Sequence, residues 1–222
     1  MSTIPVHKLQ DKTDIGFQLK AFNPEHNGHQ QSADLGAHRD DHYLFFLITQ
    51  GTGSMIVDFE EKTVNANQLY YILPEQIHYR IKSTRASGWF IAVDPLLVDP
   101  ECRNVFESWS GFQQPVMLTP PDMADYGHLL NIIYGKLTGR PRGGVNVKVL
   151  HALLRAFLEM AAGTVRMPVD ADAAGSRPAE LSRKFKKLLN EHIRNYKSPA
   201  DYASMLCISE PCLLYTSDAA DE

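Results

Sequence analysis

Two stretches within the first hundred residues carry the polar side chains best suited to binding a small ligand. The first begins at His38 and the second at Tyr71. Imidazole, guanidinium and phenol groups among aromatic residues are typical of pockets that fix a small molecule by a few polar contacts. The predicted effector-binding residues are His38, Arg39, His42, Tyr71, His78 and Arg80. Because side chains alternate along a strand, about half of such a set would point outward, and the alternative is a filled interior that binds nothing.

The sequence contains no pattern of a common catalytic site. It has no nucleophile elbow, no phosphate-binding glycine loop followed by Lys-Ser and no zinc-binding helix motif. Three cysteines, Cys102, Cys207 and Cys212, form no metal-binding pair and leave an odd thiol, which favours a reducing compartment over a disulfide framework. We therefore expect a protein that is not an enzyme and has no cofactor.

Length and composition fit a protein of the cytoplasm. The chain has 222 residues, of which 44% are hydrophobic and 22% are charged. No apolar run approaches the roughly 18 to 20 residues that a membrane span needs, and the first ten residues lack the charged and apolar regions of a signal peptide. We expect a cytoplasmic protein that has no membrane partner.

Strands are expected in the first hundred residues, where aromatic and β-branched runs alternate with Gly, Asn and Asp. A hairpin turn is expected at Gln50-Gly51-Thr52-Gly53, between two of these runs. Several short strands at close spacing predict a barrel or a sandwich. The predicted strands are 14–22, 43–50, 54–60, 68–73, 77–81 and 89–93.

Two helices are expected after this region, at 122–137 and 145–162, because apolar residues recur there every three or four positions. The break between them predicts a helical hairpin. Their apolar faces could form a subunit contact or lie against the sheet, and the pattern favours neither. The following segment, 164–178, is rich in Ala, Gly, Asp and Pro and reads as a linker.

A basic helix and a helix-turn-helix outline follow the linker. Residues 176–209 carry seven Lys and Arg against three acids, and the apolar positions of 181–196 predict an amphipathic helix. Ser198-Pro199-Ala200-Asp201 is a helix-start signal, since Ser can cap, Pro suits the first position and Asp can complete the cap. We expect a short helix to about Leu206, a tight turn at Cys207-Ile208 and a further helix capped by Ser209.

Two stretches together make the chain resemble the AraC/XylS family of bacterial transcription regulators. They are "HRDDHYLFFLITQGTGSMIVDFEEKTVNANQLYYILPEQIHYRI" and "FKKLLNEHIRNYKSPADYASMLCISEP". The resemblance implies an α+β fold with a cupin-like β-barrel (a double-stranded β-helix or jelly roll), an α-helical dimerisation hairpin and a partial helix-turn-helix. The implied segments are a sensor barrel at 10–100, a dimerisation region at 115–163, a linker at 164–178, the partial helix-turn-helix at 179–211 and an atypical tail at 212–222.

DNA, a small-molecule effector such as a sugar, and a second copy of the chain are the partners that this resemblance implies. The family's recognition helix would begin at Ser209, but the sequence leaves the family pattern after Pro211, and its last thirteen residues hold four acids and no Lys or Arg. We expect a truncated reading domain that binds DNA poorly, because groove contacts rely on cationic and amide side chains. The implied DNA-binding residues are Lys184, Lys187, Arg194, Lys197, Ser198 and Ser209.

The resemblance also raises a metal hypothesis for His38, His42 and His78, because cupin enzymes bind a metal through histidines of two strand motifs. Those enzymes place two histidines two residues apart with a glutamate shortly after, whereas His38 and His42 are four apart with a turn-like Asp40-Asp41 between them. We expect no metal at these residues. Two alternatives remain open, a metal-dependent cupin enzyme and a non-catalytic cupin module that binds a ligand or dimerises.

Overall fold

The computed structural model describes residues 4–23, 36–108, 113–139 and 146–166, and most of 181–213. In the last range it leaves out 182, 183, 186, 187, 190, 191, 193 and 194, and at Arg80 and Ser83 it describes only the backbone. The chain divides into two compact units, Met1–Glu107 with Gly111–Val165 (the sheet–helix unit) and Ser108–Ser110 with Arg166–Glu222 (the helical unit). None of the helices in the described part is long and apolar enough to cross a bilayer.

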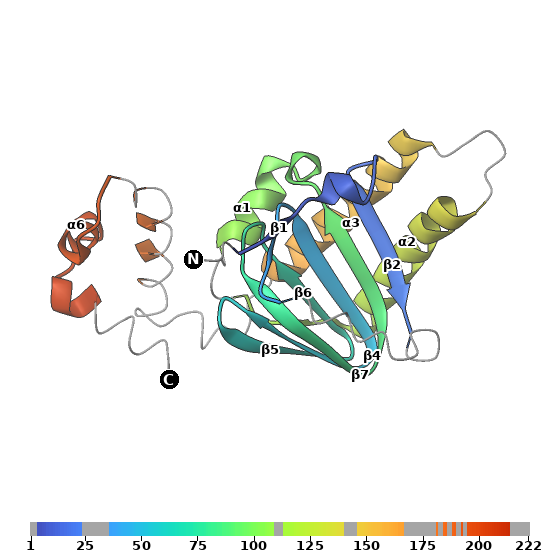
Figure 1. The fold of residues 1–222 in the computed structure, drawn as a ribbon, viewed down its shortest axis with the longest axis horizontal. Coiled ribbons are helices and arrows are strands. Elements are labelled where there is room, and N and C mark those ends of the chain that lie inside the picture. Colours follow the sequence, from blue (N-terminus) through green and yellow to red (C-terminus); the bar gives the residue numbers. More distant parts are fainter. Residues whose placement is uncertain are drawn as a thin grey trace. The chain divides into compact units, whose positions relative to one another are not determined.

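An antiparallel sheet forms the centre of the sheet–helix unit (Figure 1). Its strand order is β2-β7-β4-β6-β8, and β5 pairs with another part of β4. A separate pair of two-residue strands, β1 (Val6–His7) and β3 (Arg39–Asp40), is parallel. The bounds of the sheet strands are Phe17–Phe22 (β2), Tyr43–Val57 (β4), Glu60–Asn65 (β5), Gln68–Ile72 (β6), His78–Val93 (β7) and Val116–Met117 (β8).

The sheet does not close into a barrel, so the prediction of a β-barrel is wrong, while the α+β class is confirmed. Among the strands that the structure describes, no ladder joins β2 at one edge to β8 or β5 at the other. A closed barrel needs its first and last strands to pair along their length. Here the edge strand β8 has only two residues, which is too short to form that closing ladder.

The hairpin expected at Gln50–Gly53 is also wrong, because β4 runs through these residues without a turn. The register of β4 against β7 shifts at Gln50 and again before Thr52, which marks a bulge, and Gly51 supplies the positive φ of +72° that the bulge requires. The chain turns instead at Asp58 and Phe59, both with positive φ, between the paired residues Val57 and Glu60. Positive φ at both central residues is the geometry of a two-residue hairpin.

Both faces of the central sheet are buried. Alternate residues of β4, such as Leu44 and Phe46, belong to an apolar cluster that also contains Leu9 of the N-terminal 3-10 turn Leu9–Asp11. On the other face, Phe45 packs on Phe106 and Phe157, with ring centroids 5.3 and 5.4 Å apart. A strand that is buried on both faces is apolar at nearly every position, as β4 is from Tyr43 to Ile48.

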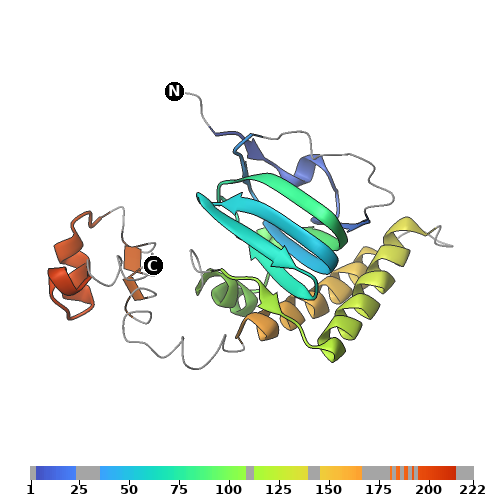
Figure 2. The same ribbon diagram turned by 90° about the horizontal axis from the view of Figure 1, so that it is seen from below.

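Three helices cover one face of the sheet, as Figure 2 shows. They are α1 (Pro100–Ser108), α2 (Pro120–Thr138) and α3 (Val147–Arg166). The last two confirm the helices expected at 122–137 and 145–162. The hydroxyl groups of Tyr126 on α2 and Thr164 on α3 are 2.9 Å apart, and Trp89 of β7 packs on Tyr134 of α2. The apolar faces of the two helices are therefore covered at least in part within this unit.

Helix α1, which follows the 3-10 turn Pro95–Leu97, was not expected from the sequence. Its start is stabilised by Asp99, whose carboxylate accepts hydrogen bonds from the backbone N–H groups of Glu101 and Cys102. These bonds are the main reason that the pKa of Asp99 is lowered. The helix buries Cys102 and Phe106 completely against the rest of the unit.

The three thiols should differ widely in reactivity. Burial, followed by the nearby carboxylates of Asp99 and Glu159, raises the pKa of Cys102 to about 12, whereas Cys207 and Cys212 are exposed. Since only the thiolate is a good nucleophile, we expect a chromogenic disulfide reagent to modify two thiols quickly in the native protein and the third only after denaturation. Equal rates for all three thiols would contradict the buried position of Cys102.

In the helical unit, α6 (Pro199–Met205) begins as the sequence predicted. Ser198 and Asp201 form a reciprocal capping box, with Pro199 at the first helical position. The chain then turns at Cys207, whose φ is +55°, and residues 210–213 are helical. Thus the predicted helix, tight turn and next helix are confirmed within the described residues.

Candidate functional site

Four histidines surround one buried carboxylate at the start of β7. We call His7, His38, Asp40, His42 and His78 the histidine cluster. All but His7 are buried, and the His7 side chain is 30% exposed. The cluster therefore has one side that faces solvent.

Three separate parts of the chain bring these residues together. The parallel pairing of β1 with β3 sets His7 opposite Asp40. His38 forms an isolated antiparallel bridge with His78, in which each backbone N–H donates to the other residue's carbonyl, at 3.3 and 3.0 Å. The rings of His7 and His38 stack at 4.4 Å, and those of His38 and His78 meet edge to face at 4.3 Å.

The Asp40 carboxylate lies at the centre of the cluster. Its Oδ1 is 3.5 Å from Nδ1 of His7, and its Oδ2 is 3.3 Å from Nε2 of His78 and 3.7 Å from Nε2 of His42. Burial favours the neutral acid, but the hydrogen bonding and charge of His78, with the charges of His42 and His38, hold the pKa of Asp40 below its usual value. Asp40 is accordingly a buried anion in the folded protein.

In three of the histidines, the ring nitrogen that faces away from Asp40 makes a hydrogen bond, and this bond determines which nitrogen carries the proton. The Nδ1–H groups of His38 and His78 donate to the backbone carbonyls of Gly36 and Gln76, at 2.9 and 3.1 Å. The Nδ1 of His42 lies 2.8 Å from a carboxylate oxygen of Asp41, which can only accept. In the neutral state, each of these rings therefore presents the lone pair of Nε2.

Burial lowers the pKa of His38 and so favours its neutral form. The neighbouring His78 lowers this pKa further, while the Gly36 carbonyl and the Asp40 carboxylate oppose the shift. A neutral imidazole next to an ionised carboxylate can bind a cation.

The other predicted effector residues do not join this cluster in the same way. Tyr71 is buried on the helix-covered face, where its hydroxyl donates to the Phe106 carbonyl and its ring packs on Phe45 and Phe106. Arg39 is partly exposed, with Nη1 3.9 Å from Glu75. The side chain of Arg80 lies outside the described residues.

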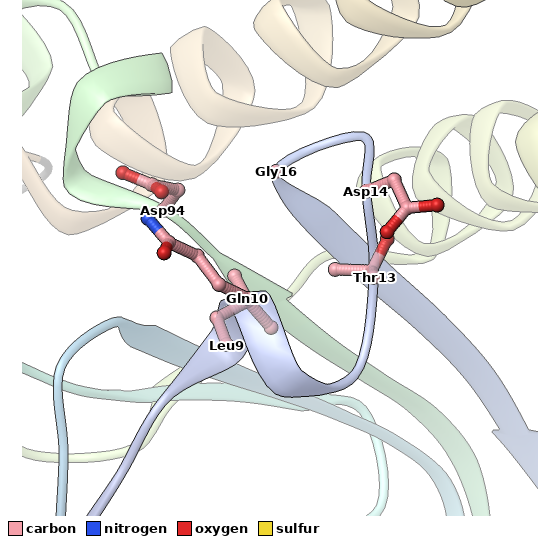
Figure 3. A pocket seen from close by; sticks show the side chains of 6 residues that line it. All are labelled: Leu9, Gln10, Thr13, Asp14, Gly16 and Asp94. Carbon is pink, nitrogen blue, oxygen red and sulfur yellow. The ribbon is translucent and has the colours of Figure 1, made fainter.

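A pocket of about 410 Å³ is present elsewhere in the same unit (Figure 3). In the view of Figure 3, the acidic side chains of Asp14 and Asp94 lie on either side of Leu9 and Gln10, with Thr13 beside Asp14. Gly16 completes the lining, and none of the predicted effector residues contributes to it. The pocket and the histidine cluster are therefore different sites.

The predicted DNA-binding residues are only partly described. Lys184, Lys197, Ser198 and Ser209 are exposed in the helical unit. Ser198 uses its side chain to cap α6, and the carbonyl of Ser209 accepts a hydrogen bond from the N–H of Leu213. Lys187 and Arg194 lie outside the described residues.

Two members of the histidine cluster, His7 and Asp40, were missed as site residues from the sequence. His7 stands alone in its stretch of chain, and only the non-local pairing of β1 with β3 brings it to His38. The sequence predicts a turn at Asp40-Asp41, whereas Asp40 lies in β3 and is buried.

No family model matches the sequence, and no curated protein matches it. Among solved structures, the chain is similar to the AraC-like transcriptional activator CuxR, with 14% identity and a TM-score of 0.35 over 78% of this chain and 59% of that one. The chain thus spans less than two thirds of CuxR.

Two further solved structures show similarities of the same low level. One is unsaturated fatty acid-bound ToxT from Vibrio cholerae, with 13% identity, coverage of 91% and 69%, and a TM-score of 0.31. The other is an oxalate decarboxylase variant from B. subtilis, with 10% identity, coverage of 41% and 32%, and a TM-score of 0.25. TM-scores this low carry no inference about the function of this chain.

Proposed function

We propose that this chain is a transcription regulator of the AraC type that contacts DNA through its helical unit and is not an enzyme. The proposal is supported by the order of a helix, a turn and a second helix in that unit. A capping box starts α6, a positive φ at Cys207 turns the chain, and residues 210–213 are helical again. This is the order of elements in a helix-turn-helix.

A small core of its own supports the helix-turn-helix interpretation. Tyr202 and Ala203 of α6 and Leu213 after the turn are buried together. The ring of Phe185 meets that of Tyr202 edge to face at 5.5 Å, and the Tyr202 hydroxyl donates to the Tyr196 carbonyl at 2.7 Å. These contacts hold the preceding helical residues and the last helical residues against α6.

Effector sensing and dimerisation are further parts of the proposal. We place sensing in the sheet–helix unit at the histidine cluster, which contains three of the predicted effector residues, His38, His42 and His78. Dimerisation would use the exposed apolar residues of the helical hairpin, which include Ile132 on α2 and Val147 and Val149 on α3. Exposed apolar side chains on neighbouring helices fit a contact with a second copy.

Charge reversal at Lys184 and Lys197 tests whether the helical unit contacts DNA. We expect the chain to bind random-sequence duplex DNA weakly at low salt, because the exposed cations of this unit meet phosphates while Glu210 stands where a recognition helix would begin. In the double variant K184E/K197E the fall of log K with log salt should become less steep, by about 2 in slope, since each phosphate contact contributes about 0.9.

Fluorescence anisotropy of a labelled duplex over a salt series measures this slope. The matched control is K8E/K20E, which makes the same charge change at two exposed lysines of the sheet–helix unit. Equal losses in the two double variants, or no binding of duplex DNA by the unmodified chain at low salt, would overturn the DNA-contact proposal.

A further inference from the structure

The geometry points to a binding site for a divalent transition-metal ion, with His7, His38 and Asp40 as ligands and His78 beside them. One candidate ligand atom from each of the three residues lies within 4.8 Å of the other two. The site needs no other part of the chain, and it does not depend on the DNA-binding role proposed above.

The spacing of the ligand atoms is close to what a metal centre requires. Metal–ligand bonds of about 2.0–2.2 Å place neighbouring ligand atoms of a tetrahedral centre roughly 3.3–3.6 Å apart. The distance from His7 Nδ1 to Asp40 Oδ1 is 3.5 Å, and that from His78 Nε2 to Asp40 Oδ2 is 3.3 Å. The ligand atom that His38 offers lies within 4.8 Å of those of His7 and Asp40.

The hydrogen bonds outside the cluster leave the inner nitrogen atoms ready to bind a cation. Because Nδ1 of His38 and Nδ1 of His78 face backbone carbonyl oxygens, those nitrogens carry the protons and Nε2 carries the lone pair. A carbonyl or carboxylate on the far nitrogen is the usual partner of a metal-bound histidine. Three histidines of this cluster have such a partner.

The protein compensates the Asp40 carboxylate only in part. Oδ1 of Asp40 is buried and accepts no hydrogen bond from any residue that the structure describes. Oδ2 lies 3.3 Å from Nε2 of His78, and this contact is an ion pair when the ring is protonated. A buried carboxylate oxygen without a partner is costly, and a metal ion would supply a positive charge at Oδ1.

The ligand chemistry identifies the class of ion. Two imidazoles and one carboxylate suit Zn²⁺ or Fe²⁺, whereas Mg²⁺ and Ca²⁺ prefer oxygen ligands. His7 is the partly exposed member, so the ion can enter from solvent and a water molecule or His78 can fill a fourth position. The sequence-based expectation that no metal binds rested on His38, His42 and His78. It did not include His7 or Asp40.

A second cluster, Asp99 with Cys102 and Glu159, is a weaker candidate for the same chemistry. The Asp99 carboxylate is already occupied by the two N–H groups at the start of α1. The raised pKa of Cys102 disfavours the thiolate that a metal would need. The histidine cluster has neither of these obstacles.

Metal titration of chelator-treated full-length protein tests the site. We expect one Zn²⁺ per chain in competition with a chromophoric chelator, and Co²⁺ should give visible ligand-field absorption that Zn²⁺ abolishes. H7Q and H38Q should each weaken Zn²⁺ binding at least about tenfold. H128Q, which changes an exposed histidine of α2, should bind as the unmodified chain does.

Each outcome bears on the proposal. H7Q removes a partly exposed ring, so it keeps the test valid if H38Q or D40N fails to fold, and circular dichroism identifies that failure. Loss of binding in folded H7Q with retention in H128Q supports the site. No stoichiometric uptake of Zn²⁺ or Co²⁺, or equal affinity in H7Q, H38Q and the unmodified chain, would overturn it. None of these readouts involves DNA, so the result is separate from the regulator proposal.

Discussion

Replacing Phe45 by Ala is expected to lower the free energy of unfolding of the sheet–helix unit by about 3–5 kcal/mol. Phe45 is completely buried and lies where β4 meets two helices, with its ring edge to face against Phe106 of α1 and Phe157 of α3. Truncation removes the transfer free energy of the ring and leaves a cavity between rigid elements that cannot collapse fully. Urea denaturation followed by circular dichroism measures the loss.

The matched control is F59A, because Phe59 lies in the hairpin turn with 77% of its surface exposed. The same chemical change there should alter the free energy of unfolding by less than about 0.5 kcal/mol. Similar effects of F45A and F59A would mean that Phe45 does not lie in a packed core.

Replacing Gly88 by Ala is expected to destabilise the same unit by about 3 kcal/mol. Gly88 lies in the middle of β7, opposite Phe22 of β2 and Ile48 of β4, with a φ of +157°. A Cβ atom at this position would lie 2.0 Å from the carbonyl oxygen of Leu47. Because that neighbour is backbone, the ladder between β4 and β7 would have to separate locally.

G53A provides the comparison for G88A. Gly53 is also in the β4–β7 ladder, but its added Cβ would meet nothing closer than 3.7 Å. We expect a change of less than about 1 kcal/mol at Gly53. Thermal unfolding of both variants under one set of conditions would show the difference, and equal midpoints would contradict the close approach at Gly88.

The regions that form strands were predicted correctly, but the position of the hairpin turn was not. Local composition identified the strand residues around Tyr43 and Trp89, because β-branched and aromatic residues report burial on a pleated surface. The two glycines at Gly51 and Gly53 suggested a turn, yet β4 continues through them. The actual turn at Asp58-Phe59 carries an unusual Phe at positive φ, so composition gave little indication of it.

Features set by nearby residues were predicted best. The cap at Ser198 and Asp201 depends on side chains three positions apart, and the structure confirms both the helix start and the turn at Cys207. Helix α1 was missed although Asp99-Pro100-Glu101 is the same kind of start signal, because only nine residues follow before the helix ends and so short a segment shows little periodicity.

The sequence predicted some members of the histidine cluster and not others. His38, His42 and His78 were predicted and do lie around one carboxylate. Tyr71 was grouped with them, but alternation along β6 places it on the opposite, helix-covered face from its neighbour Tyr70. His7 belongs to the cluster only through a two-residue parallel pair, and no local pattern predicts such a pairing.

The two-residue strand β1 has a practical consequence for anyone who isolates this protein. Whatever is fused in front of Val6 is tethered a few residues away from the Asp40 carboxylate. A polyhistidine purification tag at that end would offer competing imidazoles to the same buried anion. Such a tag would compete with His7 for the ion of the proposed metal site, so the position of a fusion partner is itself a chemical variable in this molecule.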